Sequence, residues 1–257
     1  MDIKIIVATH KKYPMPQDPM YLPVHCGKHG KESIGYQGDD TGDNISALNS
    51  YFCELTATYW AWKNLSVDYL GVSHYRRHFS DSRFPYHTLR SKPNHVLKKE
   101  DAEAYLQRAD VVVPTKRRYW IETNEGHYSH SSEFRPAELQ LMRQLLQEYS
   151  DSKYVQAFEV VLRRRWAHMF NMYIMKWELF EAFNQWQFPL LFAFEKRLDR
   201  SDYPPRENRA WISELMVDTW LEANKIRYAE CPFMFMEKQN WVKKIGDMVM
   251  RKIRNHG

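Results

Sequence analysis

The chain is short of the residues from which several common kinds of site are built. It has 3 cysteines in 257 residues, and the wide spacing of Cys26, Cys53 and Cys231 fits neither a disulfide framework nor a metal site. No apolar run reaches the roughly 18 residues of a membrane span. None of the 9 glycines belongs to a glycine-rich phosphate loop of the usual kind, which argues against a nucleotidyltransferase or sugar-phosphate transferase. These absences indicate a globular domain in a reducing compartment.

The charge balance and the N-terminal residues also bear on the compartment and the partners of the protein. The 37 basic and 32 acidic residues give a net charge of +5, which is mild for this length and does not indicate nucleic-acid binding. The first ten residues, MDIKIIVATH, carry an acidic second residue and do not read as a secretory signal. We therefore expect a cytoplasmic protein with no nucleic-acid partner.

Apolar and aromatic residues are abundant. Hydrophobic residues make up 44% of the chain and aromatic residues 15%, which is enough for one large α/β domain and suits a groove that stacks bases or sugar rings. We expect this domain to span residues 1–237. Residues 238–257 form a separate basic, amphipathic segment.

Short β-branched runs predict a mostly parallel sheet. Residues 3–8, 69–73 and 109–114 are the apolar runs typical of strands buried on both faces. Shorter strands are expected at 21–25, 170–175 and 226–229. The Pro-, Gly- and Asp-rich stretch 13–43 is otherwise a long loop, and loops of that length are usually functional.

Helical periodicity dominates the rest of the chain. A continuous apolar stripe from Ile45 to Trp62, capped by Asp43 or Asn44, predicts one long helix. Further helices are expected at 101–108, 136–149, 152–164, 177–183, 188–198 and 212–223, with loops at 117–135 and 202–209. The pattern predicts an α/β fold with a central, mostly parallel sheet and a helical C-terminal part.

A basic cluster follows the second predicted strand. His74, Tyr75, Arg76 and Arg77 stand where many nucleotide-sugar enzymes place acidic metal ligands. Guanidinium forks match phosphate oxygens, so these residues could hold a diphosphate without a metal ion. The alternative is that the arginines pair with core carboxylates such as Glu54.

Six short motifs cover most of the chain. They are KIIVATHKK (4–12), GDNIS (42–46), YFCELTATYWAWKN (51–64), DYLGVSHYRRHF (68–79), NMYIM (171–175) and ISEL (212–215). Together they resemble a family, defined by an uncharacterised domain, of bacterial capsular, exopolysaccharide and O-antigen (lipopolysaccharide) glycosyltransferases. The resemblance implies a GT-A-like fold and a UDP-sugar donor, with galactofuranose transfer in some members. The chain departs from the family at Ala210, Trp211 and Leu215, on the acceptor side.

Two segments join the basic cluster as donor-binding candidates. Thr9, His10 and Lys11 end the first strand, and ligands of open α/β sheets bind at the carboxyl ends of strands. An acidic loop could contact the uridine ribose or a divalent ion, and its candidates are Asp39, Asp40, Asp43 and Asn44. Binding of Mn²⁺ or Mg²⁺ at the diphosphate is possible but less favoured. We expect no metal ligands and no cofactor beyond the UDP-sugar itself, which is a co-substrate.

The acceptor side carries the candidates for acid–base chemistry. Inverting sugar transfer needs a carboxylate that takes the proton of the acceptor hydroxyl. Glu214 is the first candidate, ahead of Glu207 and Asp218, and its alternative role is favourable charge at a helix N-terminus. The loop 117–135 could contact the acceptor, a glycan or a polyprenyl-linked sugar. Its candidates are Glu122, His127 and His130.

The C-terminal segment suggests a membrane partner. Apolar residues of 241–254 share one helical face and basic residues surround them, as in helices that lie on anionic membranes. We therefore expect peripheral contact with the inner face of the cell membrane. The alternative function for the whole chain is a non-catalytic nucleic-acid- or glycan-binding protein with a basic, aromatic surface.

Overall fold

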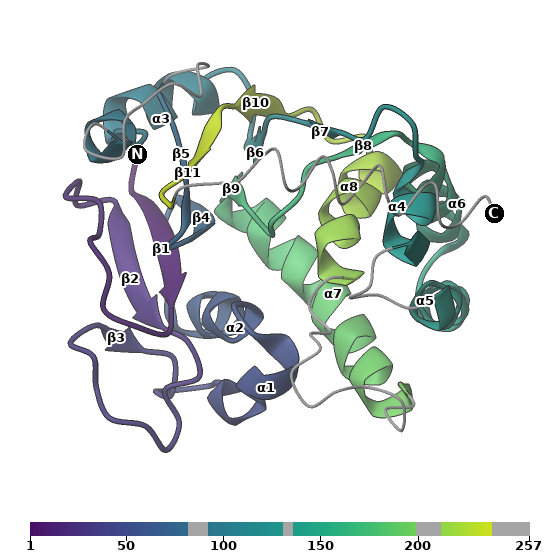
Figure 1. The fold of residues 1–257 in the computed structure, drawn as a ribbon, viewed down its shortest axis with the longest axis horizontal. Coiled ribbons are helices and arrows are strands. Elements are labelled where there is room, and N and C mark those ends of the chain that lie inside the picture. Colours follow the sequence, from purple (N-terminus) through teal and green to yellow (C-terminus); the bar gives the residue numbers. More distant parts are fainter. Residues whose placement is uncertain (82–91, 131–135, 199–211, 238–257) are drawn as a thin grey trace.

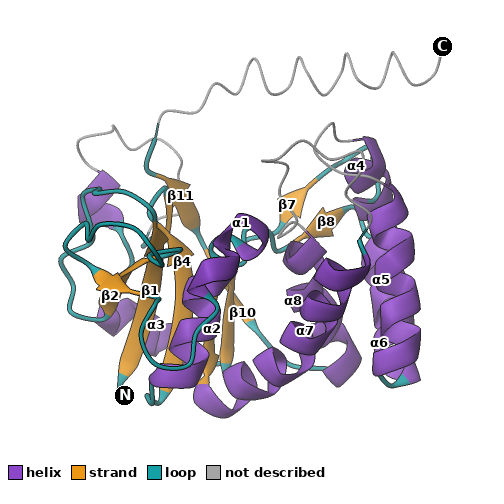
Figure 2. Cartoon of the chain, turned by 90° about the horizontal axis from the view of Figure 1, so that it is seen from below, coloured by secondary structure: helices purple, strands orange, loops and turns teal. Residues whose placement is uncertain are grey.

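A central sheet with helices on both faces forms the body of the protein (Figure 1, Figure 2). The computed structural model describes residues 1–81, 92–130, 136–198 and 212–237. In this part the main sheet has nine strands, and its principal path runs β10-β6-β9-β4-β1-β2-β3. The predicted amphipathic segment 238–257 and the predicted loop 202–209 lie outside the described residues.

The strands and helices are interspersed along the chain. The strands are β1 Ile3–Thr9, β2 Tyr21–His25, β3 Gln37–Gly38, β4 Tyr69–His74, β5 Arg77–Phe79, β6 Val111–Pro114, β7 Arg117–Arg118, β8 Trp166–Ala167, β9 Tyr173–Lys176, β10 Ala229–Cys231 and β11 Phe233–Phe235. The α-helices are α1 Asn49–Phe52, α2 Leu55–Asn64, α3 Lys99–Leu106, α4 Asn124–His130, α5 Pro136–Tyr149, α6 Ser152–Arg163, α7 Trp177–Arg197 and α8 Ser213–Asn224. Short 3-10 helices occupy Ser46–Leu48 and Lys92–His95.

The principal path of the sheet is mostly parallel, as the sequence predicted. β1 pairs in parallel with β2 and β4, and β10 pairs in parallel with β6. β9 is the exception, because it runs antiparallel between β4 and β6. The N-terminal end of β9 therefore lies at the same edge of the sheet as the carboxyl ends of its neighbours.

The two faces of the sheet bury separate apolar clusters. Ile5 and Val7 of β1 pack in the cluster that includes α3, whereas Ile6 and Ala8 pack in the larger cluster with α2, α7 and α8. Because side chains alternate along a strand, this β-branched run fills both clusters. No helix in the described ranges is long and apolar enough to cross a bilayer.

The long helix predicted from Ile45 to Trp62 is broken in the structure. The backbone of Cys53 has a φ of 49°, so the chain leaves the helix there and begins again in α2. Asn49 Nδ2 donates to the Cys53 carbonyl at 2.7 Å, which stabilises the break. Asn44 does not cap this helix, and its Oδ1 accepts from the Ser46 N–H in a local turn.

Two other expectations about local structure were wrong. Residues 124–130 of the predicted loop 117–135 form α4, whose Asn124 is buried and donates to the carbonyls of Val161 and Trp166. Residues 177–197 form one helix, α7, rather than two. Pro189 lies inside α7 with its side chain exposed, and the packed apolar residues on either side of it carry the helix through the proline.

Helix α8 is the most enclosed element on the larger face. All nine residues from Ser213 to Leu221 are buried, including Glu214, Asp218 and Thr219. A helix that is buried all round must satisfy its polar side chains within the protein. The partners of the buried acids Glu214 and Asp218 therefore indicate the role of this part of the molecule.

Candidate active site

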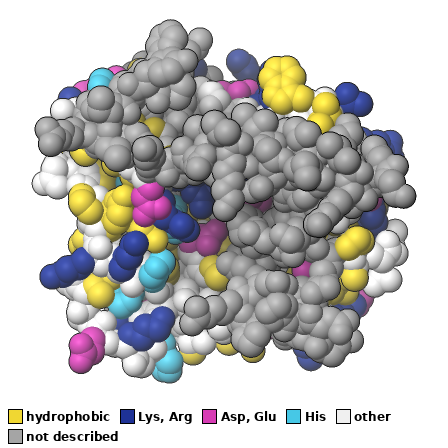
Figure 3. All heavy atoms as spheres, in the orientation of Figure 1, with side chains coloured by type: hydrophobic (Ala, Val, Ile, Leu, Met, Phe, Trp, Pro, Cys, Tyr) yellow, Lys and Arg dark blue, Asp and Glu magenta, His cyan; other side chains and the backbone are white. Residues whose placement is uncertain are grey.

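The predicted donor segments lie together at the carboxyl edge of the sheet. β1 ends at Thr9 and β4 ends at His74, and the two strands are direct neighbours in register. Figure 3 shows Lys, Arg and His side chains gathered on the side of the molecule where β1 and β2 end in Figure 1. This edge is where open α/β sheets bind their ligands.

The buried ring of Tyr75 is the centre of a basic patch. Lys11 Nζ lies 5.2 Å and the Arg76 guanidinium 5.4 Å from its centroid, and the His10 ring meets it edge-on at 5.3 Å. Desolvation lowers the pKa of His10, and the charges of Lys11 and Arg76 lower it further. The aromatic face attracts the cations while their like charges repel one another, so the patch is suited to an anion.

His74 is held neutral beside this patch. Burial, together with the charges of Arg77 and Arg76, lowers its pKa to about 2. The Arg76 backbone N–H donates to His74 Nδ1 at 3.3 Å, so this nitrogen acts as an acceptor. His74 therefore adds shape and hydrogen-bonding capacity to the site without adding charge.

Arg77 turns toward a second, buried charge cluster. Its guanidinium lies 4.3 Å from the centroid of the Phe170 ring. Burial lowers the pKa of Arg77, and the neighbouring carboxylates of Glu214 and Glu54 oppose that effect. The structure therefore separates the two arginines, since Arg76 is exposed and Arg77 faces two acids.

Glu214 is the most perturbed carboxyl group in this cluster. Burial raises its pKa to about 7, Arg77 partly offsets the rise, and the charge of Glu54 adds to it. A backbone hydrogen bond from Phe170 also favours the ionised form. A carboxyl group with a pKa near 7 can both accept and release a proton at neutral pH, which is what a general base requires.

A chain of hydrogen bonds fixes the position of Glu54. Asn171 Nδ2 donates to Glu54 Oε1 at 3.0 Å, and the Ser213 hydroxyl donates to Asn171 Oδ1 at 3.0 Å. This chain of hydrogen bonds ties the start of α2, the segment before β9 and the start of α8 to one another. Asn171 belongs to the NMYIM motif, but nothing in the sequence indicated this contact.

Two buried polar atoms beside the cluster have no hydrogen-bond partner among the described residues. They are Glu214 Oε2 and the hydroxyl of Tyr119. The charges of Arg117, Glu214 and Asp218 all act on Tyr119, and burial raises its pKa to about 12. Buried polar groups are normally paired, so two unpaired groups near one another indicate a place for a ligand.

Backbone strain is concentrated around the same cluster. Five non-glycine residues in the described ranges have a positive φ. Four of them are in the cluster or adjacent in sequence to its members: Cys53 before Glu54, Trp120 after Tyr119, and Phe170 with Asn171. Such conformations cost about 1–3 kcal/mol each and tend to occur at functional sites.

Asp218 lies one turn after Glu214 but has a different partner. Its Oδ2 accepts from the His168 N–H at 2.8 Å, and its Oδ1 lies 2.5 Å from His168 Nδ1. His168 Nε2 is 3.9 Å from Glu230, which pairs with Lys116 at 2.8 Å. These contacts give Asp218 a positioning role for the segment around β8, and sequence reasoning gave no signal for His168.

The predicted acceptor residues border Tyr119. His127 Nδ1 lies 3.2 Å from Glu122 Oε2, and the His127 ring stacks on the Tyr119 ring at 4.1 Å between centroids. His130 is the last residue of α4, and its side chain is outside the described part of the structure, as is the whole of Glu207. Their acceptor and catalytic roles stay predictions.

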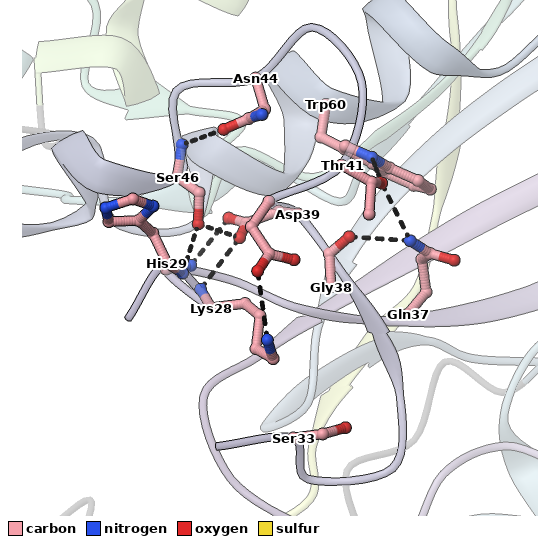
Figure 4. A network of polar contacts seen from close by, with 12 residues as sticks. Lys28, His29, Ser33, Gln37, Gly38, Asp39, Thr41, Asn44, Ser46 and Trp60 are labelled. Atoms are coloured by element: carbon pink, nitrogen blue, oxygen red, sulfur yellow. Dashed lines mark hydrogen bonds and ion pairs between the residues drawn. The ribbon is translucent and has the colours of Figure 1, made fainter. Parts of the chain in front are cut away.

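The acidic loop 39–44 is held mainly by hydrogen bonds to neighbouring segments of the protein (Figure 4). Asp39 is fully buried and accepts from the N–H groups of Gly27 and Lys28 at 2.7 and 3.0 Å, and from the Ser46 hydroxyl at 2.5 Å. Asp40 pairs with Lys28 Nζ at 3.1 Å. Asp39 therefore anchors the loop to residues 27–28 and to Ser46.

Asp43 contacts helix α2, whereas the contacts of Asn44 are local. Asp43 Oδ1 accepts from the Tyr59 hydroxyl at 3.2 Å, and Asn44 Nδ2 donates to the Gly42 carbonyl at 2.9 Å. Both side chains are accessible enough to meet a ligand in addition. No group of three or more His, Cys, Asp or Glu side chains in the described ranges is arranged to hold a metal ion.

Asp39→Ala should lower the free energy of unfolding by about 2 kcal/mol, because it leaves buried donors unpaired. Asp40→Ala is the matched control on the neighbouring residue. Its partly exposed ion pair with Lys28 is worth at most about 1 kcal/mol. Urea unfolding of both variants measures the difference, and equal losses would contradict the role assigned to Asp39.

Comparisons with known proteins agree on the kind of fold. A family model described as a domain of unknown function (DUF4422) matches residues 4–225. The chain superposes on the apo structure of the bifunctional glycosyltransferase WbbM with a TM-score of 0.83 and 24% sequence identity over 93% of its length. It spans 46% of that longer chain. A search of curated protein sequences finds no significant match.

Proposed function

The chain belongs to the DUF4422 family, and from its fold and its buried charge cluster we propose that it is a glycosyltransferase. The donor is a UDP-sugar, either UDP-galactofuranose or another UDP-hexose. The acceptor is a glycan or a polyprenyl-linked oligosaccharide. The product belongs to a bacterial surface polysaccharide such as a capsule, an exopolysaccharide or an O-antigen, made at the inner face of the cell membrane.

One observation carries this proposal more than any other. Glu214, with a pKa raised to about 7 and an unpaired Oε2, lies next to Arg77 at the edge where the basic patch ends. A proton acceptor beside an anion-binding patch is the arrangement that transfer from a sugar diphosphate needs. WbbM shares the fold, and its description as a glycosyltransferase supports the same class of reaction.

The proposed reaction assigns a role to each part of the site. Lys11 and Arg76, which both face the Tyr75 ring, bind the diphosphate. The acceptor oxygen attacks the anomeric carbon, the bond from that carbon to the diphosphate oxygen breaks, and UDP leaves with the electron pair. The hydroxyl proton passes to Glu214 Oε2. Attack on the face opposite the leaving diphosphate inverts the configuration at the anomeric carbon.

Arg76→Ala should weaken UDP binding about 10- to 100-fold, the cost of losing one charge-assisted hydrogen bond. The melting temperature should not change, because Arg76 is exposed and forms no ion pair with a described residue. Isothermal titration with UDP measures the affinity. Arg108→Ala, which removes an exposed arginine just after α3, is the matched control.

Added chelator distinguishes the basic patch from a metal at the diphosphate. If Arg76 and Lys11 carry the phosphate charge, UDP affinity in EDTA equals that in Mg²⁺ or Mn²⁺. The role of the basic patch would be contradicted if UDP affinity depended on the metal and Arg76→Ala left that affinity unchanged.

Thermal stabilisation by UDP separates the transferase from a nucleic-acid-binding protein. UDP should raise the melting temperature of the wild-type protein, because a ligand of the folded state stabilises it by mass action. Salt-sensitive retention of an oligonucleotide without any effect of UDP would favour the non-catalytic alternative.

A further inference from the structure

Trp120 and Ile121 form an exposed apolar point at the edge of the candidate site. The preceding residue, Tyr119, is buried with 5% of its surface exposed, whereas Trp120 is 75% and Ile121 45% exposed. The φ of 54° at Trp120 turns the chain so that Tyr119 faces inward and Trp120 outward. A strained backbone that holds a large apolar side chain in solvent calls for a functional explanation.

Arginines surround this apolar point. Arg117 and Arg118 form β7, and its partner strand β8 follows Arg163 and Arg165, so the chain positions of four exposed arginines lie near Trp120. Arg165 donates to the Trp120 carbonyl at 3.4 Å, which brings the two segments together. Figure 3 shows exposed hydrophobic atoms bordered by Lys and Arg side chains over the region of β7 and β8.

The acidic residues near these arginines are already engaged. Glu122 pairs with His127, and Glu222 pairs with Arg164 and Lys225. Arg118, Arg163 and Arg165 form no ion pair with a described residue. The surface around Trp120 is therefore apolar at its centre and positively charged around it.

We propose that this surface, called here the Trp120 point, is where the protein docks onto a membrane rich in anionic phospholipid. Tryptophan favours the interface between lipid and water, and each nearby Arg or Lys adds attraction to anionic headgroups. A second copy of the chain is a poorer occupant. Two side chains supply on the order of 300 Å² of apolar surface, whereas a stable dimer buries roughly 800 Å² per partner.

The position of the Trp120 point links membrane contact to the candidate site. Trp120 follows directly after Tyr119, whose unpaired hydroxyl lies in the field of Glu214. Docking through Trp120 therefore brings that side of the site to the lipid surface. Membrane binding itself does not depend on the proposed transfer reaction, so the two can fail separately.

Vesicle co-sedimentation tests the apolar part of this inference. The wild-type full-length protein should bind phosphatidylglycerol vesicles, and Trp120→Gly with Ile121→Ser should reduce that binding at least tenfold. Glycine at 120 accepts the positive φ, so the double variant should fold and unfold at the wild-type temperature. Val160→Ser, which changes an exposed apolar residue on α6, should bind as the wild type does.

Charge reversal tests the basic part. Loss of one arginine near an anionic surface weakens binding roughly fivefold, so Arg118→Glu with Arg165→Glu should lower it by well over tenfold. Arg108→Glu, just after α3, is the matched control for charge. Binding of the wild type should also fall as salt rises and should be weak on phosphatidylcholine vesicles.

Three results would overturn the proposal. They are a wild-type protein that does not bind anionic vesicles, equal binding by the Trp120 point variants and their controls, and equal binding to anionic and neutral vesicles. Sedimentation velocity tests the other possible occupant, a second copy of the chain. A wild-type dimer that Trp120→Gly dissociates, without vesicle binding, would make the Trp120 point a contact between copies.

Discussion

Glu214→Gln is expected to lower the rate of sugar transfer about 10²- to 10⁴-fold while leaving UDP affinity unchanged, the usual consequence of losing a general base. Glutamine keeps the shape of the side chain but cannot take the acceptor proton. The measurement is the turnover number for transfer from the UDP-sugar, with UDP affinity determined separately by titration.

The pH dependence of wild-type transfer gives a second readout of the same residue. Because burial raises the pKa of Glu214 to about 7, the rate should rise as pH rises through that value, as the ionised base becomes populated. Glu214→Gln should lose this rise. A wild-type rate that is flat from pH 5 to 9 would contradict the assignment.

The pH dependence of stability shows whether the raised pKa is real. The pKa of Glu214 is higher in the folded chain than its ordinary value of 4.5, so the folded state binds more protons between about 4.5 and 7. Stability should therefore fall as pH rises through this window, and Glu214→Gln should remove that part of the fall.

Asp218→Asn is the matched control on the same helix. It changes a buried carboxyl group whose partner is His168, and it should lower stability more than it lowers the rate per folded molecule. If Glu214→Gln retained near-normal turnover, the role of the base would pass to Glu207 or Glu122. If none of these substitutions mattered, the inverting, carboxylate-based mechanism would have to be given up.

Arg77→Met should lower the free energy of unfolding by about 1–3 kcal/mol, the usual cost of leaving buried polar groups without a favourable partner. The reason is that Glu214 and Glu54 would lose the cation that faces both. Urea unfolding at pH 8, above the pKa of Glu214, measures the loss. Arg76→Met, on the exposed neighbour, should stay within about 0.5 kcal/mol of the wild type.

A double-mutant cycle separates the charge interaction between Arg77 and Glu214 from ordinary packing. Arg77→Met combined with Glu214→Gln should recover a large part of the stability lost by Arg77→Met alone, because the uncompensated charge is then removed. Additive losses would mean that Arg77 stabilises the fold through its contact with Phe170 rather than through Glu214.

The sequence indicated the central strands β1, β4 and β6 because each is a short apolar run with two buried faces. It placed the last predicted strand at 226–229 instead of Ala229–Cys231, and it did not indicate β3, β5 or β11. The bounds of β2 and α5 agree with those expected from Tyr21–His25 and Pro136–Tyr149. The break at Cys53 was missed, since the apolar stripe of α1 and α2 continues across a left-handed residue that no pattern reveals. The antiparallel direction of β9 could not be predicted from the sequence, because strand direction in a sheet depends on contacts between distant segments.

The candidate site was predictable in its residue types but not in its contacts. Arg77 and Glu214 were both singled out, yet one was assigned to the donor and the other to the acceptor, and only the fold places them in one cluster. Tyr119 and His168 were missed because each owes its role to tertiary neighbours rather than to a local pattern. The roles of Thr9, His10 and Lys11 at the donor stay predictions.

The measurement that tests the central claim most directly is the release of UDP from a panel of UDP-sugars, followed by mass spectrometry, for the wild type and Glu214→Gln in parallel. We predict that the wild type cleaves at least one UDP-sugar, and that Glu214→Gln is stabilised by UDP to the same extent but releases it at least 100 times more slowly. A wild-type protein that is neither stabilised by UDP nor active on any UDP-sugar would contradict the account, as would equal turnover by Glu214→Gln.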